Sequence, residues 1–332
     1  MKAFEKVCYR RREYSCNNDI WELRHNWNTR RPELLEELNS GTYKFDCVKE
    51  VVIDGQLYNI WAARDAVVIE ALTMLLKDKY NITENCNSYH LKGRGGIKAA
   101  LNQTERCLAN NKFVMKSDVK KYYASLDHDI LMNLIREYVN ESPVTQLIYQ
   151  FLKHVKYRNG NYVDVRRGIC RGTALSPLLG ALYLKPLDQA MGKMNVAYVR
   201  YMDDWIVMST NRWTFARAVK KVNRTINNLK LEKAHDKTFI GTVKRGFDFL
   251  GFHFGLAGRT LSGKSVQSPP EGRIKFAENI AVRLCKAEYD RYKTIKGGNP
   301  IPESVSLYVK RFTKWVNSTY EWKTGLCETS GS

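Results

Sequence analysis

The sequence has 332 residues, which is enough to bury a substantial core in one large unit or in two to three subdomains and excludes a peptide hormone or a small disulfide-bonded scaffold. Lysine and arginine total 54 against 34 aspartate and glutamate residues, and this net charge of +20 favours a polyanionic partner, with nucleic acid ahead of membranes and acidic proteins. The eight cysteines form no C-x-x-C pair, and neither a secretory signal nor an apolar run of about 18 residues is present, so we expect a cytoplasmic protein with reduced thiols and no membrane span.

The first 80 residues predict a basic extension followed by a hairpin and a helix. Residues 1–46 are rich in arginine and contain a helical pattern at 32–41, PELLEELNSG, that ends at a glycine stop. Two β-branched stretches flank Asp54 and Gly55 in 47–60, which is a strong hairpin signal. Residues 65–80 repeat apolar side chains at three- and four-residue spacing and therefore predict a helix.

The middle of the chain alternates strands and helices, but without the regular strand–helix repeat of a parallel barrel. Residues 113–119 predict a strand that ends at Asp118, and 128–141 an amphipathic helix. Residues 174–191 predict a single helix with Pro177 near its start, and 197–208 two strands around a pair of carboxylates. A helix is expected at 214–229, and a loop rich in Gly, Ser and Pro at 258–272 predicts a boundary before a basic helical segment.

The paired aspartates Asp203 and Asp204 are the first candidate site. Adjacent carboxylates in a buried hairpin repel each other and lose hydration, and a hard divalent cation such as Mg²⁺ would relieve both costs. A solvated Asp-Asp turn is the simpler alternative for this pair alone. Asp118, at the end of another apolar strand, would bring a third carboxylate, although it could instead be a helix N-cap. Two metal ions would then be able to activate a 3'-hydroxyl and stabilise a pyrophosphate leaving group.

Seven sequence blocks resemble, in their order and spacing, those of reverse transcriptases of the bacterial group II intron-like class. The blocks lie within residues 47–255 and include MKSDVKKYYASLDHDIL, GICRGTALSPLLGALYLKPLD, YVRYMDDWIVM, LKLEKAHDKTFIG and GFDFLGFHF. The resemblance implies an α+β right-hand polymerase with fingers, a palm built on an antiparallel sheet, and a small helical thumb. It assigns 1–46 to a basic N-terminal extension, 47–258 to fingers and palm, and 259–332 to a basic helical thumb and tail.

The resemblance also implies catalytic roles. Asp118 and Asp203 would bind the metal ions, with the backbone carbonyl of Val119 assisting and Asp204 close by. Lys237 would donate a proton to the departing pyrophosphate, because a lysine beside phosphates stays charged. A surface lysine is the alternative for this residue.

Further residues would contact the nucleotide and the primer. Tyr123 matches the aromatic residue that lies under the incoming sugar and would exclude a 2'-hydroxyl, although an ordinary core tyrosine is the alternative. Gly172 would allow close approach to the nascent base pair. The expected primer and template contacts are Ser176, Pro177, Gly251 and Phe252, although simple core packing is the alternative for Gly251 and Phe252.

Two departures from the family pattern affect nucleotide binding. Arg171 stands where relatives usually have glutamine, which would place a cation beside the nucleotide. Tyr58-Asn59 replaces an arginine-proline pair that helps to hold the triphosphate. The remaining candidates for triphosphate contacts, each of which could be a surface cation or a template contact, are Lys49, Arg64 and Arg94.

We therefore expect an RNA-directed DNA polymerase that uses two Mg²⁺ ions, with Mn²⁺ as a substitute, and deoxynucleoside triphosphates. Its partners would be an RNA template, foremost a structured noncoding RNA, and the RNA–DNA duplex that it makes. A role in antiviral defence is favoured over a mobile retroelement. The rivals are an RNA-binding scaffold without polymerase activity and an RNA-dependent RNA polymerase, which Tyr123 and the Y-x-D-D form disfavour. The sequence leaves the natural template, the priming and the oligomeric state open.

Overall fold

The structure is a computed structural model, and it describes residues 1–261 except 15–17, 54–55, 85, 159 and 256–257. One compact unit contains residues 1–12, 17–51 and 59–262 and so includes nearly all of the described chain. In the second unit, the described residues are 13–14, 52–53 and 56–58. The predicted thumb therefore lies outside the described residues apart from its first three positions.

Two N-terminal helices, α1 (Lys2–Arg10) and α2 (Asp19–His25), pack against α4 (Ala63–Asp78), and α3 (Trp27–Ser40) packs against α2. All three contribute buried side chains to the same hydrophobic core as the rest of the unit. The side chain of Asn18 accepts a hydrogen bond from the Ile20 amide and caps α2. Gly41 ends α3 in the left-handed conformation with a φ of 73°, which confirms the predicted glycine stop. The division at residue 46 stays a prediction.

A first sheet joins stretches that are about 100 residues apart in the chain. Its order is β2 (Gln56–Ile60), β1 (Val48–Ile53), β4 (Val155–Arg158) and β5 (Asn161–Asp164). The strands predicted on either side of residues 54–55 are therefore neighbours in one sheet. Strand β1 runs parallel to β4, and Val48 faces Lys156. The helices α7 (His128–Arg136) and α8 (Ser142–Leu152) precede β4 and contribute buried side chains to the core.

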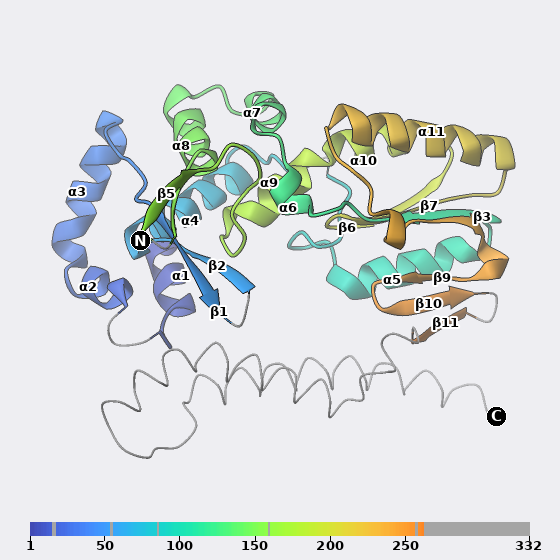
Figure 1. The fold of residues 1–332 in the computed structure, drawn as a ribbon, viewed down its shortest axis with the longest axis horizontal. Helices are drawn as coiled ribbons and strands as arrows, with labels where there is room; N and C mark the ends of the chain where they lie inside the picture. The colour runs from blue at the N-terminus through green and yellow to red at the C-terminus, as the bar shows by residue number, and fades with distance from the viewer. Residues whose placement is uncertain (15–17, 54–55, 85, 159, 256–257, 262–332) are drawn as a thin grey trace, which may run out of the picture. The chain divides into compact units, whose positions relative to one another are not determined.

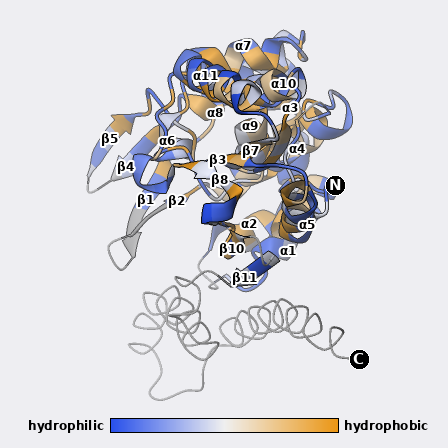
Figure 2. Ribbon diagram, turned by 90° about the vertical axis from the view of Figure 1, so that its right-hand side faces the viewer, coloured by the Kyte–Doolittle hydropathy of each residue, from blue (hydrophilic) through white to orange (hydrophobic). Residues whose placement is uncertain are grey.

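The second sheet is antiparallel and positions the candidate site. Its order is β6 (Ala197–Tyr201), β7 (Asp204–Ser209), β3 (Phe113–Ser117) and β8 (Phe239–Thr242). Residues 205–209 of β7 are all buried, so helices cover both faces of this strand. The helices α10 (Lys185–Gly192) and α11 (Arg212–Asn228) lie on one side of the sheet and α5 (Gly96–Leu108) on the other (Figures 1 and 2).

The predicted single helix over 174–191 is wrong in one respect, because the chain forms two helices. Helix α9 (Leu175–Tyr183) ends at Leu184, and α10 begins at Lys185 with Pro186 in its first turn. Proline lacks the amide hydrogen that would continue the helix, and its ring clashes with the carbonyl group four residues earlier. Pro186 is well placed in the first turn of a new helix, where no amide partner is needed.

A third sheet occupies part of the predicted loop over 258–272. Strands β9 (Phe247–Phe249), β10 (Phe252–Gly255) and β11 (Gly258–Leu261) form an antiparallel meander, so the loop prediction is wrong for residues 258–261. The rest of that loop lies outside the described residues. Short elements complete the unit: α6 (Tyr122–Ser125), η1 (His235–Lys237) and η2 (Val243–Arg245).

The α+β class predicted from the sequence is confirmed by these helices and largely antiparallel sheets. Within residues 1–261, as far as they are described, no helix is both long and apolar enough to cross a membrane.

Candidate active site

Three carboxylates from two distant stretches of chain gather at one end of the antiparallel sheet. Asp118 directly follows β3, Asp203 lies in the β6–β7 turn, and Asp204 begins β7. Strands β3 and β7 pair so that Ser117 faces Trp205, which brings the end of β3 alongside the start of β7. The charge of Asp118 acts on both of the other carboxyl groups.

The turn that carries Asp203 is tight and strained. Tyr201 pairs with Asp204, so only Met202 and Asp203 connect the two strands. Met202 has a φ of 56°, in the left-handed region that costs a residue with a side chain about 1–3 kcal/mol. Such strain persists only where the surroundings hold it, and it fixes the direction of the next side chain, that of Asp203.

Burial and mutual repulsion change the acidity of the paired aspartates. Burial raises the pKa of Asp203 to about 6, and the neighbouring charge of Asp118 adds to the increase. Burial likewise raises the pKa of Asp204 to about 7; the nearby ammonium of Lys116 opposes this rise, and the charge of Asp118 reinforces it. Each of these carboxyl groups therefore holds its proton more tightly than an ordinary aspartate, and a nearby cation would favour the ionised forms.

Two lysines already approach the carboxylates. The Nζ atom of Lys237 lies 2.7 Å from Oδ2 of Asp118, and this hydrogen bond, together with the charge of Asp118, raises the pKa of the lysine. Lys116 Nζ lies 3.4 Å from Oδ1 of Asp204, an oxygen that is buried and accepts no hydrogen bond within the described residues. Sequence reasoning missed Lys116, although it lies two residues before Asp118, on the same side of the strand.

The carboxylates fit Mg²⁺ by their chemistry, although they do not form a closed cage. No group of three or more His, Cys, Asp or Glu side chains in the described part of the chain is arranged to hold a metal ion by itself. Mg²⁺ is typically bound by one or two carboxylates, with water and substrate phosphates as the other ligands. Asp118 and Asp203, with the unsatisfied Oδ1 of Asp204 beside them, match that partial ligand set.

The backbone after Asp118 is held by the segment that leads to Lys237. Val119 is buried and forms an isolated antiparallel bridge with Lys233. The carbonyl of Asp118 accepts a hydrogen bond of 2.8 Å from the Ala234 amide. The contribution of the Val119 carbonyl to metal binding stays a prediction.

Tyr123 and Arg171 lie beside this site. The ring of Tyr123 is partly buried, and the guanidinium of Arg171 is 5.8 Å from its centroid. Burial raises the pKa of Tyr123 to about 12, with a further contribution from the charge of Asp203. The tyrosine is therefore near Asp203 and Arg171, and its contact with the sugar stays a prediction.

Gly168 supports Tyr123 and was missed by sequence reasoning. Its φ is 84°, and a Cβ atom there would lie 2.8 Å from the Cα of Ala124 and 2.9 Å from the carbonyl oxygen of Tyr123. The backbone at residue 168 thus packs directly on the turn that carries Tyr123. Gly172 also has a positive φ, 85°, but a Cβ there would meet open space, so this glycine is needed for its backbone conformation.

The predicted primer and template residues lie in two places. Ser176 is buried and donates a hydrogen bond to the Cys170 carbonyl, so its hydroxyl shapes the loop. Pro177 is exposed. Gly251 has a φ of 82° in the two-residue turn between β9 and β10, and Phe252 is buried with the Arg259 guanidinium 5.3 Å from its ring centroid. Their contacts with nucleic acid stay predictions.

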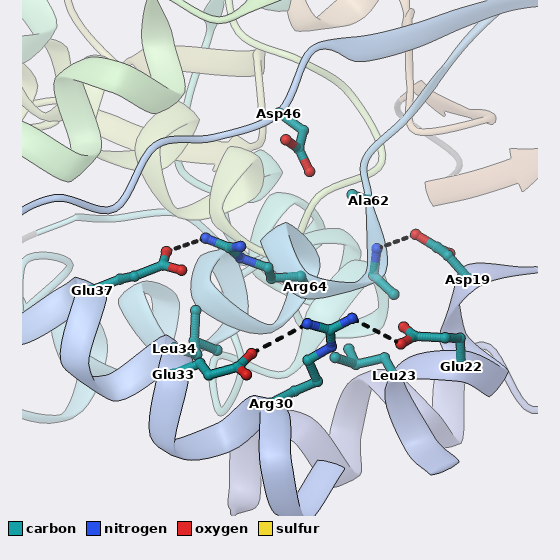
Figure 3. Close-up of a pocket in the computed structure, with 11 residues that line it drawn as sticks. Asp19, Glu22, Leu23, Arg30, Glu33, Leu34, Glu37, Asp46, Ala62 and Arg64 are labelled. Atoms are coloured by element: carbon teal, nitrogen blue, oxygen red, sulfur yellow. Dashed lines mark hydrogen bonds and ion pairs between the residues drawn. The ribbon is translucent and has the colours of Figure 1, made fainter. Parts of the chain in front are cut away.

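The three candidate triphosphate contacts do not join the carboxylates. Lys49 is exposed on β1, and Arg94 is exposed and donates to the Glu84 carbonyl at 3.0 Å. Arg64 forms an ion pair with Glu37 and lines a cavity of about 270 Å³ near α2 and α3 (Figure 3). Within the described residues, none of the three forms a hydrogen bond or ion pair with Asp118, Asp203 or Asp204.

Comparisons with known proteins identify relatives of this chain. A family described as "Reverse transcriptase (RNA-dependent DNA polymerase)" matches residues 66–254, which is more than half of the chain. Protein YkfC of Escherichia coli is 24% identical over 301 residues, covering 76% of this chain and 79% of that protein. The group II intron-encoded protein LtrA of Lactococcus lactis is 23% identical over 207 residues, covering 60% of this chain but only 34% of LtrA.

Among solved structures, telomerase from Candida albicans in complex with a fragment of telomeric RNA matches with a TM-score of 0.49 and 12% identity, covering 87% of this chain and 56% of that one. The family match spans both strands that carry the aspartates. By that match, the chain belongs to the reverse transcriptases, the RNA-dependent DNA polymerases, and its relatives mark it as one of the group II intron-like kind.

Proposed function

We propose that this chain copies an RNA template into DNA by adding deoxynucleotides to a primer, with Asp118 and Asp203 binding two Mg²⁺ ions and Asp204 completing the acidic site. The observation that carries this proposal is the convergence of these three carboxylates at the end of one antiparallel sheet. Mn²⁺ would substitute for Mg²⁺, because it accepts the same oxygen ligands.

When bound, the two ions would activate the primer 3'-hydroxyl and neutralise the charge that develops on the leaving pyrophosphate. Lys237 keeps its proton beside Asp118 and would be positioned to donate it to the pyrophosphate. The ring of Tyr123 would collide with the 2'-hydroxyl of a ribonucleotide, and Arg171 would place a positive charge against the nucleotide.

Nucleic acid would bind through positively charged surfaces and a thumb. Helix α11 contains no acidic residue and has exposed cations at helical spacing, among them Arg217, Lys220 and Arg224. We propose residues 47–258 as fingers and palm and 259–332 as a thumb that holds the RNA–DNA duplex, with 1–46 as a basic extension. The net charge of +20 supports binding to the phosphate backbone.

We further propose that the template is a dedicated structured noncoding RNA and that its copying serves antiphage defence. The alternative role is that of a mobile retroelement, which the similarity to a group II intron-encoded protein favours. Sequencing the RNA and DNA that copurify from the host would separate the two: a single bound RNA with its DNA copy supports a dedicated template, and copies of the chain's own messenger or intron RNA support mobility.

The test of the proposed activity is primer extension on an RNA template with Mg²⁺ and either deoxynucleotides or ribonucleotides. We expect extension with deoxynucleotides by the wild type and only background activity for Asp203→Ala. Asp78→Ala is the matched control, because Asp78 is an exposed carboxylate at the end of α4, and it should retain full activity. Equal extension by the Asp203→Ala variant would contradict the site assignment. RNA binding without extension would support the scaffold, and extension with ribonucleotides alone would support an RNA polymerase.

A further inference from the structure

The backbone N–H and C=O groups of Met202 are both held by side chains outside the catalytic group. Met202 lies in the strained position of the β6–β7 turn, directly before Asp203. The conformation of Met202 therefore determines where the Asp203 carboxylate points. Any group that holds the Met202 backbone therefore also controls the position of Asp203, a proposed metal ligand.

On the amide side, the Met202 N–H lies 3.2 Å from the Ser88 hydroxyl and 3.3 Å from Nδ1 of His90, and it donates to both. Ser88 and His90 are also hydrogen-bonded to each other at 2.7 Å. Since Nδ1 accepts the Met202 hydrogen, Nε2 carries the ring proton and donates it to the Pro177 carbonyl at 3.3 Å. His90 thus connects the catalytic turn to the start of α9.

The Ser88–His90 segment is itself fixed beside β6. The amide of Tyr89 donates a hydrogen bond of 2.9 Å to the Arg200 carbonyl, two residues before Met202. Ser88 is buried. The two side chains are therefore presented to the turn by a short segment that is paired with the strand leading into it.

On the carbonyl side, Nη1 of Arg200 donates to the Met202 oxygen at 2.9 Å. The Arg200 side chain is fully buried and bound by Asp188, with Nε 2.7 Å from Oδ1 and a second hydrogen bond from Nη2 to Oδ2. Asp188 also accepts hydrogen bonds from the Tyr198 hydroxyl at 2.9 Å and the Asn87 amide at 2.7 Å. A buried ion pair with this many partners holds the guanidinium in one orientation.

We propose that Ser88, His90 and the Asp188–Arg200 pair are positioning residues that clamp the Met202 backbone and thereby direct the Asp203 carboxylate toward the metal ion. This inference rests on the proposed function of Asp203. These residues would act through the backbone of the turn and not through direct contact with the substrate or the metal. The competing view is that the same contacts only stabilise the fold.

His90 offers the sharpest test, because one substitution keeps the acceptor and another removes it. In His90→Asn, the side-chain oxygen reaches the position of Nδ1 and can still accept from Met202. In His90→Leu, a side chain of similar bulk has no acceptor, and Ser88→Ala combined with it removes both acceptors of the Met202 amide. His25→Leu, at an exposed histidine on α2, is the matched control.

Testing the hydrogen bond to the Met202 carbonyl needs a variant that does not leave a buried charge without its partner. Removing Arg200 alone would leave Asp188 buried without its partner, which is strongly destabilising. The double substitution Asp188→Asn and Arg200→Met removes both charges and the donor to Met202 together. Thermal melting reports whether this variant folds, and the His90 series tests the clamp independently if it does not.

The measurements are primer extension at varied deoxynucleotide and Mg²⁺ concentrations, Mn²⁺ binding followed by electron paramagnetic resonance, and thermal melting. For Ser88→Ala with His90→Leu, we expect kcat to fall about 10- to 100-fold and Mn²⁺ to bind about 10-fold more weakly. The KM for deoxynucleotide and the melting temperature should change little, and His90→Asn should recover most of the loss.

Wild-type kcat and wild-type Mn²⁺ affinity in the variant that combines Ser88→Ala with His90→Leu would overturn the clamp. So would a loss that the lower melting temperature fully explains, with no advantage of His90→Asn over His90→Leu. Failure of the proposed function is a separate result, because it appears as a wild type without extension or an active Asp203→Ala variant. Mn²⁺ binding tests the clamp even in that case.

Discussion

At the scale of single residues, the site depends on contacts that hold Tyr123 and the aspartates in place. The amide of Ile169 donates a hydrogen bond of 2.7 Å to the Tyr123 carbonyl, and the Gly168 amide donates one of 2.8 Å to Leu126. The glycine backbone lies against the same turn. Tyr123 therefore has little freedom to move away from the proposed sugar position.

Gly168→Ala should disturb both stability and nucleotide selection. The new Cβ would meet backbone atoms at 2.8–2.9 Å in a residue with a φ of 84°, so we expect a loss of about 1–3 kcal/mol in the free energy of unfolding. Displacement of Tyr123 should lower the ratio of deoxynucleotide to ribonucleotide kcat/KM about tenfold or more.

Urea unfolding and paired primer-extension assays measure these two effects. Gly192→Ala is the control, since a Cβ there would meet open space and the residue ends a helix without a positive φ. It should leave both quantities almost unchanged. An unaltered nucleotide ratio in Gly168→Ala would show that Tyr123 does not depend on this packing.

Residues with a motif of their own could be identified from the sequence, and residues that act through space could not. Asp118, Asp203 and Tyr123 lie within recognisable blocks, and the structure brings them near one another. Lys116, Gly168 and His90 gain their importance only from partners between 44 and 112 positions away or from backbone packing. Conversely, Arg64 matched a block by charge, but its guanidinium is bound to Glu37.

At the scale of elements, sequence patterns predicted strands β1, β2, β3, β6 and β7 and helices at α3, α4, α7, α9–α10 and α11, but did not predict β4, β5 or β8. The errors have local causes. The break between α9 and α10 comes from Pro186, whose effect on the helix depends on its position within the turn. Strand β11 forms because β10 offers it a pairing edge, which composition alone does not reveal. The order of the sheets, in which β4 lies beside β1, depends on contacts across about 100 residues.

The β9–β10 hairpin provides a test at this scale. Leu250 and Gly251 connect paired Phe249 and Phe252, and their φ values are 50° and 82°. Positive values at both central positions match a type I' turn, which prefers Asn-Gly. We expect Leu250→Asn to raise the free energy of unfolding by up to about 1 kcal/mol and Gly251→Ala to lower it by about the same amount. Urea denaturation would reveal this; a stabilised Gly251→Ala would contradict the turn geometry.

At the scale of the whole molecule, one continuous core supports the site and contains ionisable groups that should make stability depend on pH. His154 is 4% exposed, packs against the stacked rings of Trp61 and Phe151, and burial lowers its pKa to about 4. The pKa of His128 is also lowered by burial. The pKa of Asp65 shifts in the opposite direction, because burial raises it to about 6.

A histidine that is neutral when folded gains protons on unfolding in mild acid. The free energy of unfolding therefore falls as the pH drops from 6.5 toward 4, and the part that comes from His154 is on the order of 3 kcal/mol. His154→Phe should remove this part of the acid sensitivity, so the difference in stability between variant and wild type should shift in favour of the variant between pH 7 and pH 4.5. Urea denaturation at both pH values measures this shift, and a constant difference would contradict the buried neutral state.

The central claim is that Asp118 and Asp203, from two distant strands, bind a shared metal ion at the growing end of a DNA strand. The most direct measurement is the anomalous scattering of Mn²⁺ in crystals of the protein with a primed RNA template and an unreactive deoxynucleotide. We predict a Mn²⁺ ion about 2 Å from a carboxylate oxygen of each of these two residues. Mn²⁺ bound only elsewhere, with no ion in contact with both Asp118 and Asp203, would contradict the account.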